Sequence, residues 1–305
     1  MGKSARRGNV LLVSRSRVVL VWWVACLLWS AGWLFIKVGL RDLPPLSFAA
    51  TRLALAFVVL AAIVTVRHEW RALRATDLPA IAVSGVLLLG VNYALTFWGA
   101  QYLPSAITSV LQATSPVFGF LIGTAIGAER FSIARAVALP IGVAGVALIS
   151  RGQFDAGNVS TFGSAAVLGG AACAAIAYAI VKQRAVHLPP AVMVATQTLC
   201  AFVPLSIAAW TLEGSPFDLR WSRSAMLALL YLSIASSVIA FWLNYWLLKR
   251  VTATTVLAMG LVQPLIAAAL GALILGERFG IDAAIGGAAV LVSAAIILRR
   301  ERGYY

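Results

Sequence analysis

Ser105, Thr108, Gln112 and Ser115 carry hydrogen-bonding side chains at spacings of three, four and three residues. On a helix this spacing places all four along one face. Residues 78–128 around them contain no Asp, Glu, Lys or Arg, so a helix here has an apolar environment. There the polar face must meet protein or a water-filled cavity. Hydroxyls and amides could then hold a small polar molecule, or they could bond to neighbouring helices.

A related stretch lies 148 residues further along. It consists of Ala253, Val256, Gly260 and Gln263, with Met259 beside them. A proline follows each stretch at once, Pro116 in the first and Pro264 in the second. Because proline removes a backbone hydrogen bond, each could free a carbonyl to face a ligand. We predict that both glutamines and Met259 line a cavity together with the hydroxyls.

Aromatic and amide residues form a second set of candidates. Those chosen for a cavity wall are Trp29, Asn92, Tyr93, Tyr178, Trp242, Asn244 and Tyr245. Aromatic walls accept varied apolar groups, while amide and phenol groups hold polar ends. Tryptophans also gather in belts at the membrane surface, where we place Trp22, Trp23, Trp98, Trp210, Trp221 and Trp246.

Five charged residues are candidates for a gate or a structural ion pair: Lys37, Arg52, Lys182, Glu129 and Glu277. Arg52 lies well inside an apolar segment, where a charge requires a partner or a function. The two lysines fall at segment ends, from which long side chains reach the membrane surface. Each glutamate is followed by an arginine, so we expect an interfacial ion pair that opens the next helix.

Little in the sequence supports catalysis. It contains no HExxH motif, no glycine-rich phosphate loop and no Ser/His/Asp set. The three cysteines fall inside apolar segments, which argues against a disulfide framework. The two histidines lie far apart, which argues against a metal site. We expect no cofactor, no metal and no enzyme activity; a membrane-embedded enzyme or a scaffold is the alternative class.

The composition indicates that these residues lie in a lipid bilayer. Of the 305 residues, 62% are hydrophobic and 11% are charged, whereas soluble domains carry about 25% charged residues. A bilayer core requires about 20 apolar residues per helix. The sequence therefore predicts an all-α polytopic membrane protein. We place ten transmembrane helices at 18–40, 44–66, 78–100, 104–126, 131–150, 161–182, 189–211, 223–248, 252–274 and 280–298.

The chain also repeats itself. Lys37–Thr51 recurs as Lys182–Thr196 with its Leu-Pro-Pro, and Pro116…Glu129-Arg130-Phe131 recurs as Pro264…Glu277-Arg278-Phe279. We expect a first five-helix repeat at 18–150 and a second at 161–298, a linker at 151–160, and tails at 1–17 and 299–305. Because five is odd, the second repeat enters the membrane from the opposite side, so the repeats are inverted. Such duplicated membrane proteins are typically transporters with the substrate site between the repeats.

Positive charges give the orientation. Of the 24 Lys and Arg residues, 17 fall on the side of the N-terminus, six fall on the other side, and Arg52 lies between. The positive-inside rule then places both termini in the cytoplasm and the linker in the periplasm. The net charge of +14 follows from this topology, so we expect no nucleic-acid partner.

Ten helices in two such repeats resemble the drug/metabolite transporter superfamily, specifically its EamA-type exporters. Trp29-Ser30 followed by Lys37 is similar to the family's opening Trp-Gly…Lys, and Arg52 matches its intramembrane arginine. The two Glu-Arg pairs resemble the motif that closes each repeat. The second half departs from the pattern, with Ala174-Ala175 in place of Trp29-Ser30 and Gln197 in place of Arg52.

The resemblance implies a multi-pass protein of the bacterial inner membrane that exports small metabolites. YddG-like members export amino acids, and the aromatic helices favour aromatic and other neutral ones. We expect a monomer in the lipid bilayer that works by alternating access around a site between its third, fourth, eighth and ninth helices. Multidrug, purine or other metabolite efflux is the alternative. All ten acidic residues fall in predicted loops or at helix ends, which favours facilitated over proton-driven movement.

Overall fold

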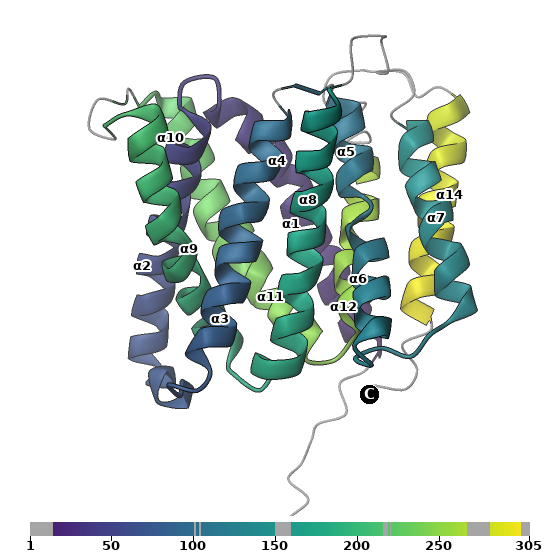
Figure 1. Cartoon of the computed structure of the whole chain (residues 1–305), viewed down its shortest axis with the longest axis horizontal. Helices are drawn as coiled ribbons and strands as arrows, with labels where there is room; N and C mark the ends of the chain where they lie inside the picture. Colours follow the sequence, from purple (N-terminus) through teal and green to yellow (C-terminus); the bar gives the residue numbers. More distant parts are fainter. Residues whose placement is uncertain are drawn as a thin grey trace, which may run out of the picture.

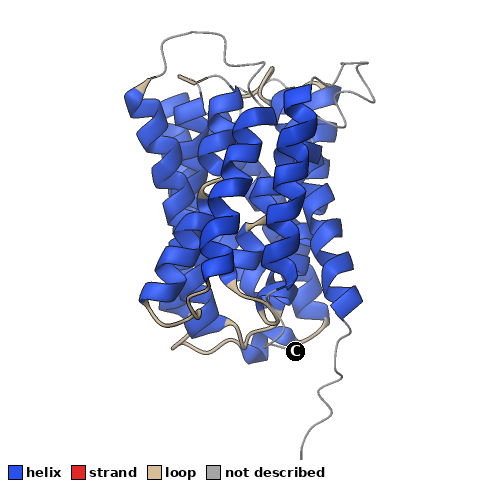
Figure 2. Ribbon diagram, turned by 90° about the vertical axis from the view of Figure 1, so that its right-hand side faces the viewer, coloured by secondary structure: helices blue, strands red, loops and turns tan. Residues whose placement is uncertain are grey.

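The described residues of the computed structural model are 15–100, 102–103, 105–149, 160–215, 219, 221–266 and 281–299, and their regular secondary structure is entirely helical. The helices run along a common axis, with loops at the two ends of the bundle (Figures 1 and 2). In chain order they are α1 (Arg15–Gly39), α2 (Pro45–Val66), η1 (Glu69–Ala72), α3 (Leu78–Gly85), η2 (Val86–Val91), α4 (Asn92–Ala100), α5 (Ser105–Gln112), α6 (Ser115–Ala125), α7 (Ile133–Ile149), α8 (Thr161–Ile180), η4 (Val181–Ala185), α9 (Pro190–Glu213), α10 (Arg223–Tyr231), η6 (Leu232–Ile239), α11 (Ala240–Leu248), α12 (Ala253–Leu257), a helix at 259–266, and α14 (Ile281–Arg299).

Within the described part of the chain, five helical segments are long and apolar enough to cross a membrane. They are Pro45–Val66, Leu78–Gly99, Thr161–Ala185, Pro190–Glu213 and Arg223–Leu248. Shorter apolar helices cover Val110–Ala125, Ile133–Ile149, Ala253–Ile266 and Ala284–Arg299. The predicted all-α, polytopic membrane architecture is confirmed.

Two long helices contain a widened π-helical turn near their middle. The helix predicted at 78–100 is α3, η2 and α4 in unbroken succession, and the one predicted at 223–248 is α10, η6 and α11. Both π segments, η2 and η6, occupy matching places in the two halves of the chain. No local spacing in the sequence indicated them, although such turns often mark functional sites.

The helix predicted at 104–126 is interrupted. It forms α5 and α6, and Pro116 starts the second piece, where a missing backbone N–H is tolerated. The carbonyl that Pro116 leaves without its helical donor is that of Gln112. The Ser115 hydroxyl donates to this carbonyl at 2.7 Å. The Gln112 carbonyl is thus bonded by a neighbouring hydroxyl, and a role for it in holding a ligand stays a prediction. Further on, α12 ends before Ala258, whereas Pro264 lies inside the helix at 259–266.

The path of the chain divides the loops between the two ends. Those joining α2 to α3, α8 to α9 and α11 to α12 lie at one end, here called the α2–α3 end, and those joining α1 to α2 and α9 to α10 lie at the other (Figure 1). Beside the bundle, α7 packs antiparallel to α14. There a Cβ on Gly145 or Gly286 would lie within 2.7 Å of the other's carbonyl oxygen. Small residues thus let these two helices approach closely.

The prediction that Trp22 lies in a tryptophan belt at the membrane surface is wrong. Its side chain is fully buried, and its indole N–H donates to the Thr255 carbonyl at 2.8 Å. Trp22 therefore joins α1 to α12 across 233 positions of sequence instead of lying at the membrane surface.

We predict that Gly85→Ala lowers the melting temperature of the purified protein, whereas Gly90→Ala does not. A Cβ at position 85 would lie 2.8 Å from the backbone Cα and O of Gln197, so α3 and α9 would have to separate, at a cost of about 1–3 kcal/mol. At position 90 the nearest atom is Val86 Cγ1 at 3.9 Å, and alanine favours a helix by about 1 kcal/mol. Thermal unfolding in detergent measures the melting temperatures of both variants. Equal melting temperatures would contradict the close contact between α3 and α9 at Gly85.

Candidate functional site

A buried guanidinium lies at the centre of the bundle. Arg52 on α2 is 4% exposed. Its Nε donates to the Ser237 hydroxyl at 2.8 Å, and its Nη2 donates to the Ser236 hydroxyl at 3.1 Å. The ring of Tyr93 lies beside it, with the guanidinium carbon 5.4 Å from the ring centroid. Arg52 thus connects the first half of the chain to the second.

The π segment η6 places three serines against this arginine. Ser236 and Ser237 accept from the side chain, and the Ser233 hydroxyl donates to the Arg52 backbone carbonyl at 3.3 Å. The wider turn of a π helix turns consecutive residues through a smaller angle than an α helix does. Two neighbouring hydroxyls can therefore reach the same guanidinium.

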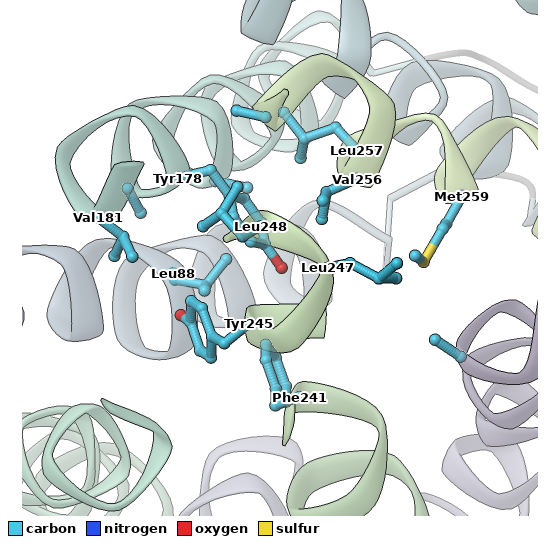
Figure 3. Packing of buried hydrophobic residues seen from close by; sticks show 14 of the residues in the cluster. Leu88, Tyr178, Val181, Phe241, Tyr245, Leu247, Leu248, Val256, Leu257 and Met259 are labelled. Carbon is cyan, nitrogen blue, oxygen red and sulfur yellow. The ribbon is translucent and has the colours of Figure 1, made fainter. Parts of the chain in front are cut away.

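A row of aromatic rings begins beside Ser236 of η6. The Trp29 indole N–H donates to the Ser236 carbonyl at 3.0 Å, and its ring meets Phe241 edge-on with centroids 5.2 Å apart. Phe241 stacks on Tyr245 at 6.4 Å, and Tyr245 lies 6.3 Å from Tyr178. Figure 3 shows Phe241 and Tyr245 projecting from one helix, with Tyr178 coming from another.

Gln197 on α9 occupies the position that matches Arg52 in the second half. Its amide nitrogen donates to the Ser84 hydroxyl at 2.7 Å, and its amide oxygen accepts from the Tyr245 hydroxyl. Arg52 therefore bonds to the eighth predicted helix, and Gln197 bonds to the third. The two contacts correspond, but only the first carries a charge.

Asn244 is fully buried beside these groups. Its amide nitrogen and oxygen have no hydrogen-bond partner within bonding distance in the described structure, although the Tyr178 phenol faces the amide. A buried amide without a partner costs about 1–3 kcal/mol. Such an amide is suited to a ligand or a water molecule, which would supply the missing bonds.

We call these residues the central cluster: Trp29, Arg52, Tyr93, Tyr178, Gln197, Ser236, Ser237, Phe241, Asn244 and Tyr245. The structure brings six predicted candidates together in it, namely Trp29, Arg52, Tyr93, Tyr178, Asn244 and Tyr245. Sequence reasoning missed Ser236, Ser237 and Phe241, and it named Gln197 only as a departure from the family pattern. The available signal was a Ser-x-x-Ser-Ser run inside an apolar helix, at 233–237.

Asn92 and Gln112 belong to a different network. The Gln112 amide donates to Thr96 Oγ1 at 2.5 Å, and that hydroxyl donates to the Asn92 amide oxygen at 3.2 Å. A Cβ on Gly170 of α8 would lie 2.8 Å from Thr96 Oγ1, so this network is pressed against α8. The Gln112–Thr96 bond joins α5 to α4, which is the second of the two roles considered for the polar stripe, whereas the Thr96–Asn92 bond lies within α4.

The remaining cavity candidates show no described contact with the central cluster. Trp242 has the Arg67 guanidinium over its ring at 5.3 Å, at the α2–α3 end. The Met259 carbonyl accepts from the Cys26 thiol at 3.6 Å. Thr108 is buried, and Gln263 is partly buried and has interactions of its own. Glu277 lies outside the described residues, as do the side chains of Lys37 and Ser105.

Glu129 joins the two halves at the α2–α3 end. Its carboxylate accepts from the Thr254 backbone N–H at 3.0 Å and from the Thr254 hydroxyl at 2.7 Å, at the start of α12. It also pairs with Arg135 of α7 at 3.3 Å, and both side chains are almost fully buried. The expected partner was the adjacent Arg130, which is exposed. The ion pair thus has a different arginine and a buried position.

Two lysines also form hydrogen bonds with backbone carbonyls at the α2–α3 end. Lys182 Nζ donates to the carbonyls of Leu248 at 2.5 Å and Val251 at 2.8 Å, where α11 ends. A cation there complements the helix terminus. Lys249 donates to the His187 carbonyl at 3.3 Å, and burial together with Arg250 lowers the pKa of Lys249.

The opposite end carries a second acidic contact. Glu213, at the end of α9, accepts from the backbone N–H groups of Leu46 at 2.8 Å and Ser47 at 2.7 Å, where α2 begins. The Ser47 hydroxyl donates to it as well, at 2.7 Å. At each end of the bundle, a carboxylate from one half therefore accepts hydrogen bonds from a helix start in the other. Among the described residues, no group of three His, Cys, Asp or Glu is arranged to hold a metal.

An apolar helical bundle with a polar and aromatic centre between two halves is the construction of a small-molecule membrane transporter. The profile of the EamA-like transporter family matches residues 16–151 and again 161–299, so the chain belongs to this family.

The chain is 30% identical to the uncharacterized inner membrane transporter YedA of Escherichia coli K12, over 82% of this chain and 80% of YedA. It is 25% identical to a probable amino-acid metabolite efflux pump of the same organism, over 82% of this chain and 84% of that protein. A crystal structure with 20% identity superposes with a TM-score of 0.79, covering 95% of this chain and 99% of that one, a likeness of fold alone.

We predict that Glu129→Gln lowers the melting temperature and slows transport. The change leaves Arg135 buried without its carboxylate and weakens the contact with α12; breaking a buried pair costs about 3–5 kcal/mol. The control is Glu69→Gln, which removes a pair to the half-exposed Arg67 and changes stability by about 1 kcal/mol at most. Thermal unfolding compares the two variants, and a Glu129→Gln protein as stable as the control would contradict the assignment.

Proposed function

We propose that this protein exports amino acids, chiefly aromatic and other neutral ones over a broad range, across the bacterial inner membrane. The observation that carries the proposal is the central cluster, in which aromatic rings surround neutral polar groups and one guanidinium. Rings accept varied apolar side chains, and the polar groups hold the backbone end of the substrate. Similarity to a probable amino-acid metabolite efflux pump supports the same substrate class, which is that of YddG-like exporters.

The mechanism we propose is alternating access between two inverted repeats, residues 18–150 and 161–298. Supporting this, Arg52 bonds to the eighth helix and Gln197 to the third, and a π segment lies in each of those helices. The Glu129 contact with α12 and the Glu213 contact with α2 would then open in turn, each exposing the central cluster to one side. Both termini are proposed to be cytoplasmic, from the distribution of Lys and Arg.

Efflux of lipophilic cations is the second candidate, together with purines and other metabolites. A cation site normally contains a carboxylate, and the contacts of Asp42, Glu69, Asp77, Glu129 and Glu213 all lie outside the central cluster. The cluster's single charge is positive, which disfavours cations by direct repulsion. The family assignment argues against an enzyme or a scaffold.

Bacteria that express this protein should tolerate toxic amino-acid analogues better than cells carrying the empty vector. Export lowers the cytoplasmic concentration of an analogue, so the inhibitory concentration should rise severalfold for aromatic analogues. Growth inhibition assays with an aromatic analogue and a lipophilic cation measure the preference. Protection against the cation alone would favour the second candidate.

Export should require only a substrate gradient. The described acidic residues lie in loops or at helix ends, and buried Glu129 is held by Arg135 and Thr254; a proton carrier is normally exposed to water in turn on each side. Proteoliposomes with symmetric pH should show counterflow and net flux equal to those under an imposed pH gradient. Concentrative uptake that depends on the pH gradient would contradict facilitated transport and direct attention to Glu129 and Glu277.

A further inference from the structure

Arg52 is a buried charge without a carboxylate partner in the described structure. A guanidinium has five N–H donors, and the described chain supplies acceptors for two of them, the hydroxyls of Ser236 and Ser237. Five described carboxylates bond to groups other than Arg52: Asp42 contacts Ser222, Glu69 contacts Arg67, Asp77 contacts His187, Glu129 contacts Arg135 and Thr254, and Glu213 contacts α2. A buried, uncompensated ion is costly, so its presence requires a reason.

Holding the two halves together does not require this charge. Gln197 occupies the matching position in the second half and bridges helices with a neutral amide, through Ser84 and Tyr245. The same packing is thus achieved without desolvating an ion. The positive charge of Arg52 is better explained by a ligand that carries the opposite charge.

Arg52 and the neighbouring serine hydroxyls offer the hydrogen-bond donors that a carboxylate requires. A planar guanidinium binds a carboxylate through two parallel hydrogen bonds. The Ser236 and Ser237 hydroxyls accept from Arg52 here, and each can rotate to donate to a carboxylate. Trp29 bonds to the backbone of Ser236, and Phe241 packs against Trp29, so the two rings can cover an apolar body attached to that carboxylate.

We infer that Arg52, with Ser236 and Ser237, binds the carboxylate of the transported molecule, and that this group, not the ammonium, is what its substrates must share. The inference deepens the proposed export function and rests on it. Asp42, Glu69, Asp77, Glu129 and Glu213 all bond to groups outside the central cluster, so none of these five carboxylates is an anionic partner for an ammonium group there. A molecule that keeps the carboxylate and the aromatic body but lacks the amine should therefore bind.

The test measures binding of four compounds to the purified full-length protein: L-phenylalanine, 3-phenylpropionate, L-phenylalaninamide and phenethylamine. The first two carry a carboxylate, and the last two do not. Both carboxylates should bind at least about tenfold more tightly than the other two, the effect of losing one or two charge-assisted hydrogen bonds. The Arg52→Gln variant should bind the two carboxylates more weakly by a similar factor, and it should no longer prefer them to the two compounds without a carboxylate. The control Arg67→Gln removes a charge outside the cluster and should leave all four affinities unchanged.

The comparison of compounds on the wild-type protein needs no variant, so the test holds even where Arg52→Gln fails to fold. The inference is overturned by phenethylamine binding as tightly as phenylalanine, by wild-type protein that binds none of the four, or by a folded Arg52→Gln protein with unchanged carboxylate affinity. Flux in vesicles separates this result from the proposed function. Arg52-dependent carboxylate binding without amino-acid flux refutes the export proposal alone, whereas equal flux of phenylalanine and its amide refutes only the carboxylate site.

Discussion

A positive charge buried between the two halves of the bundle is the constraint on which the centre of this protein depends. In an apolar medium a guanidinium must be surrounded by acceptors and a polarisable face. The acceptors are two serine hydroxyls of η6, and the polarisable face is the ring of Tyr93 on α4. Trp29 in turn bonds to the backbone of η6. The positions of α1, α2, α4 and η6 are thereby linked through two side chains, Arg52 and Trp29.

The two ends of the bundle follow a complementary rule. At each end a carboxylate from one half accepts backbone N–H groups where a helix of the other half begins: Glu129 at Thr254, and Glu213 at Leu46 and Ser47. A negative charge at a helix N-terminus is favourable, and more so when water is excluded. These bonds are short-range and directional, so a small separation of the halves breaks them completely. Contacts of this kind suit the opening of each end in turn that we propose for alternating access.

The helices were predictable because the bilayer imposes a length of about 20 apolar residues on each span. Predicted spans such as 78–100 and 223–248 coincide with the observed helical segments. The candidates Trp29, Arg52, Tyr93, Tyr178, Asn244 and Tyr245 could be chosen because aromatic, amide and charged groups are unusual in apolar spans, and the structure places them together.

Long-range pairing could not be predicted. Arg52 lies 184 positions from Ser236, and Glu129 lies 125 positions from Thr254, so no local spacing connects them. The π turns at η2 and η6 likewise left no periodic pattern in the sequence. Trp22 resembled a belt residue by its place near the start of α1, yet packing against α12 buries it. Gln112 resembled a ligand group by its spacing, yet its partner is Thr96 on the preceding helix.

The most direct test of the central claim is a crystal structure of the protein with L-4-bromophenylalanine, with the bromine located by anomalous scattering. The account predicts a carboxylate within hydrogen-bonding distance of the Arg52 guanidinium and the bromine among the rings of Trp29, Phe241 and Tyr245. A ligand bound beside Gln112, or one whose carboxylate lies away from Arg52, would contradict it.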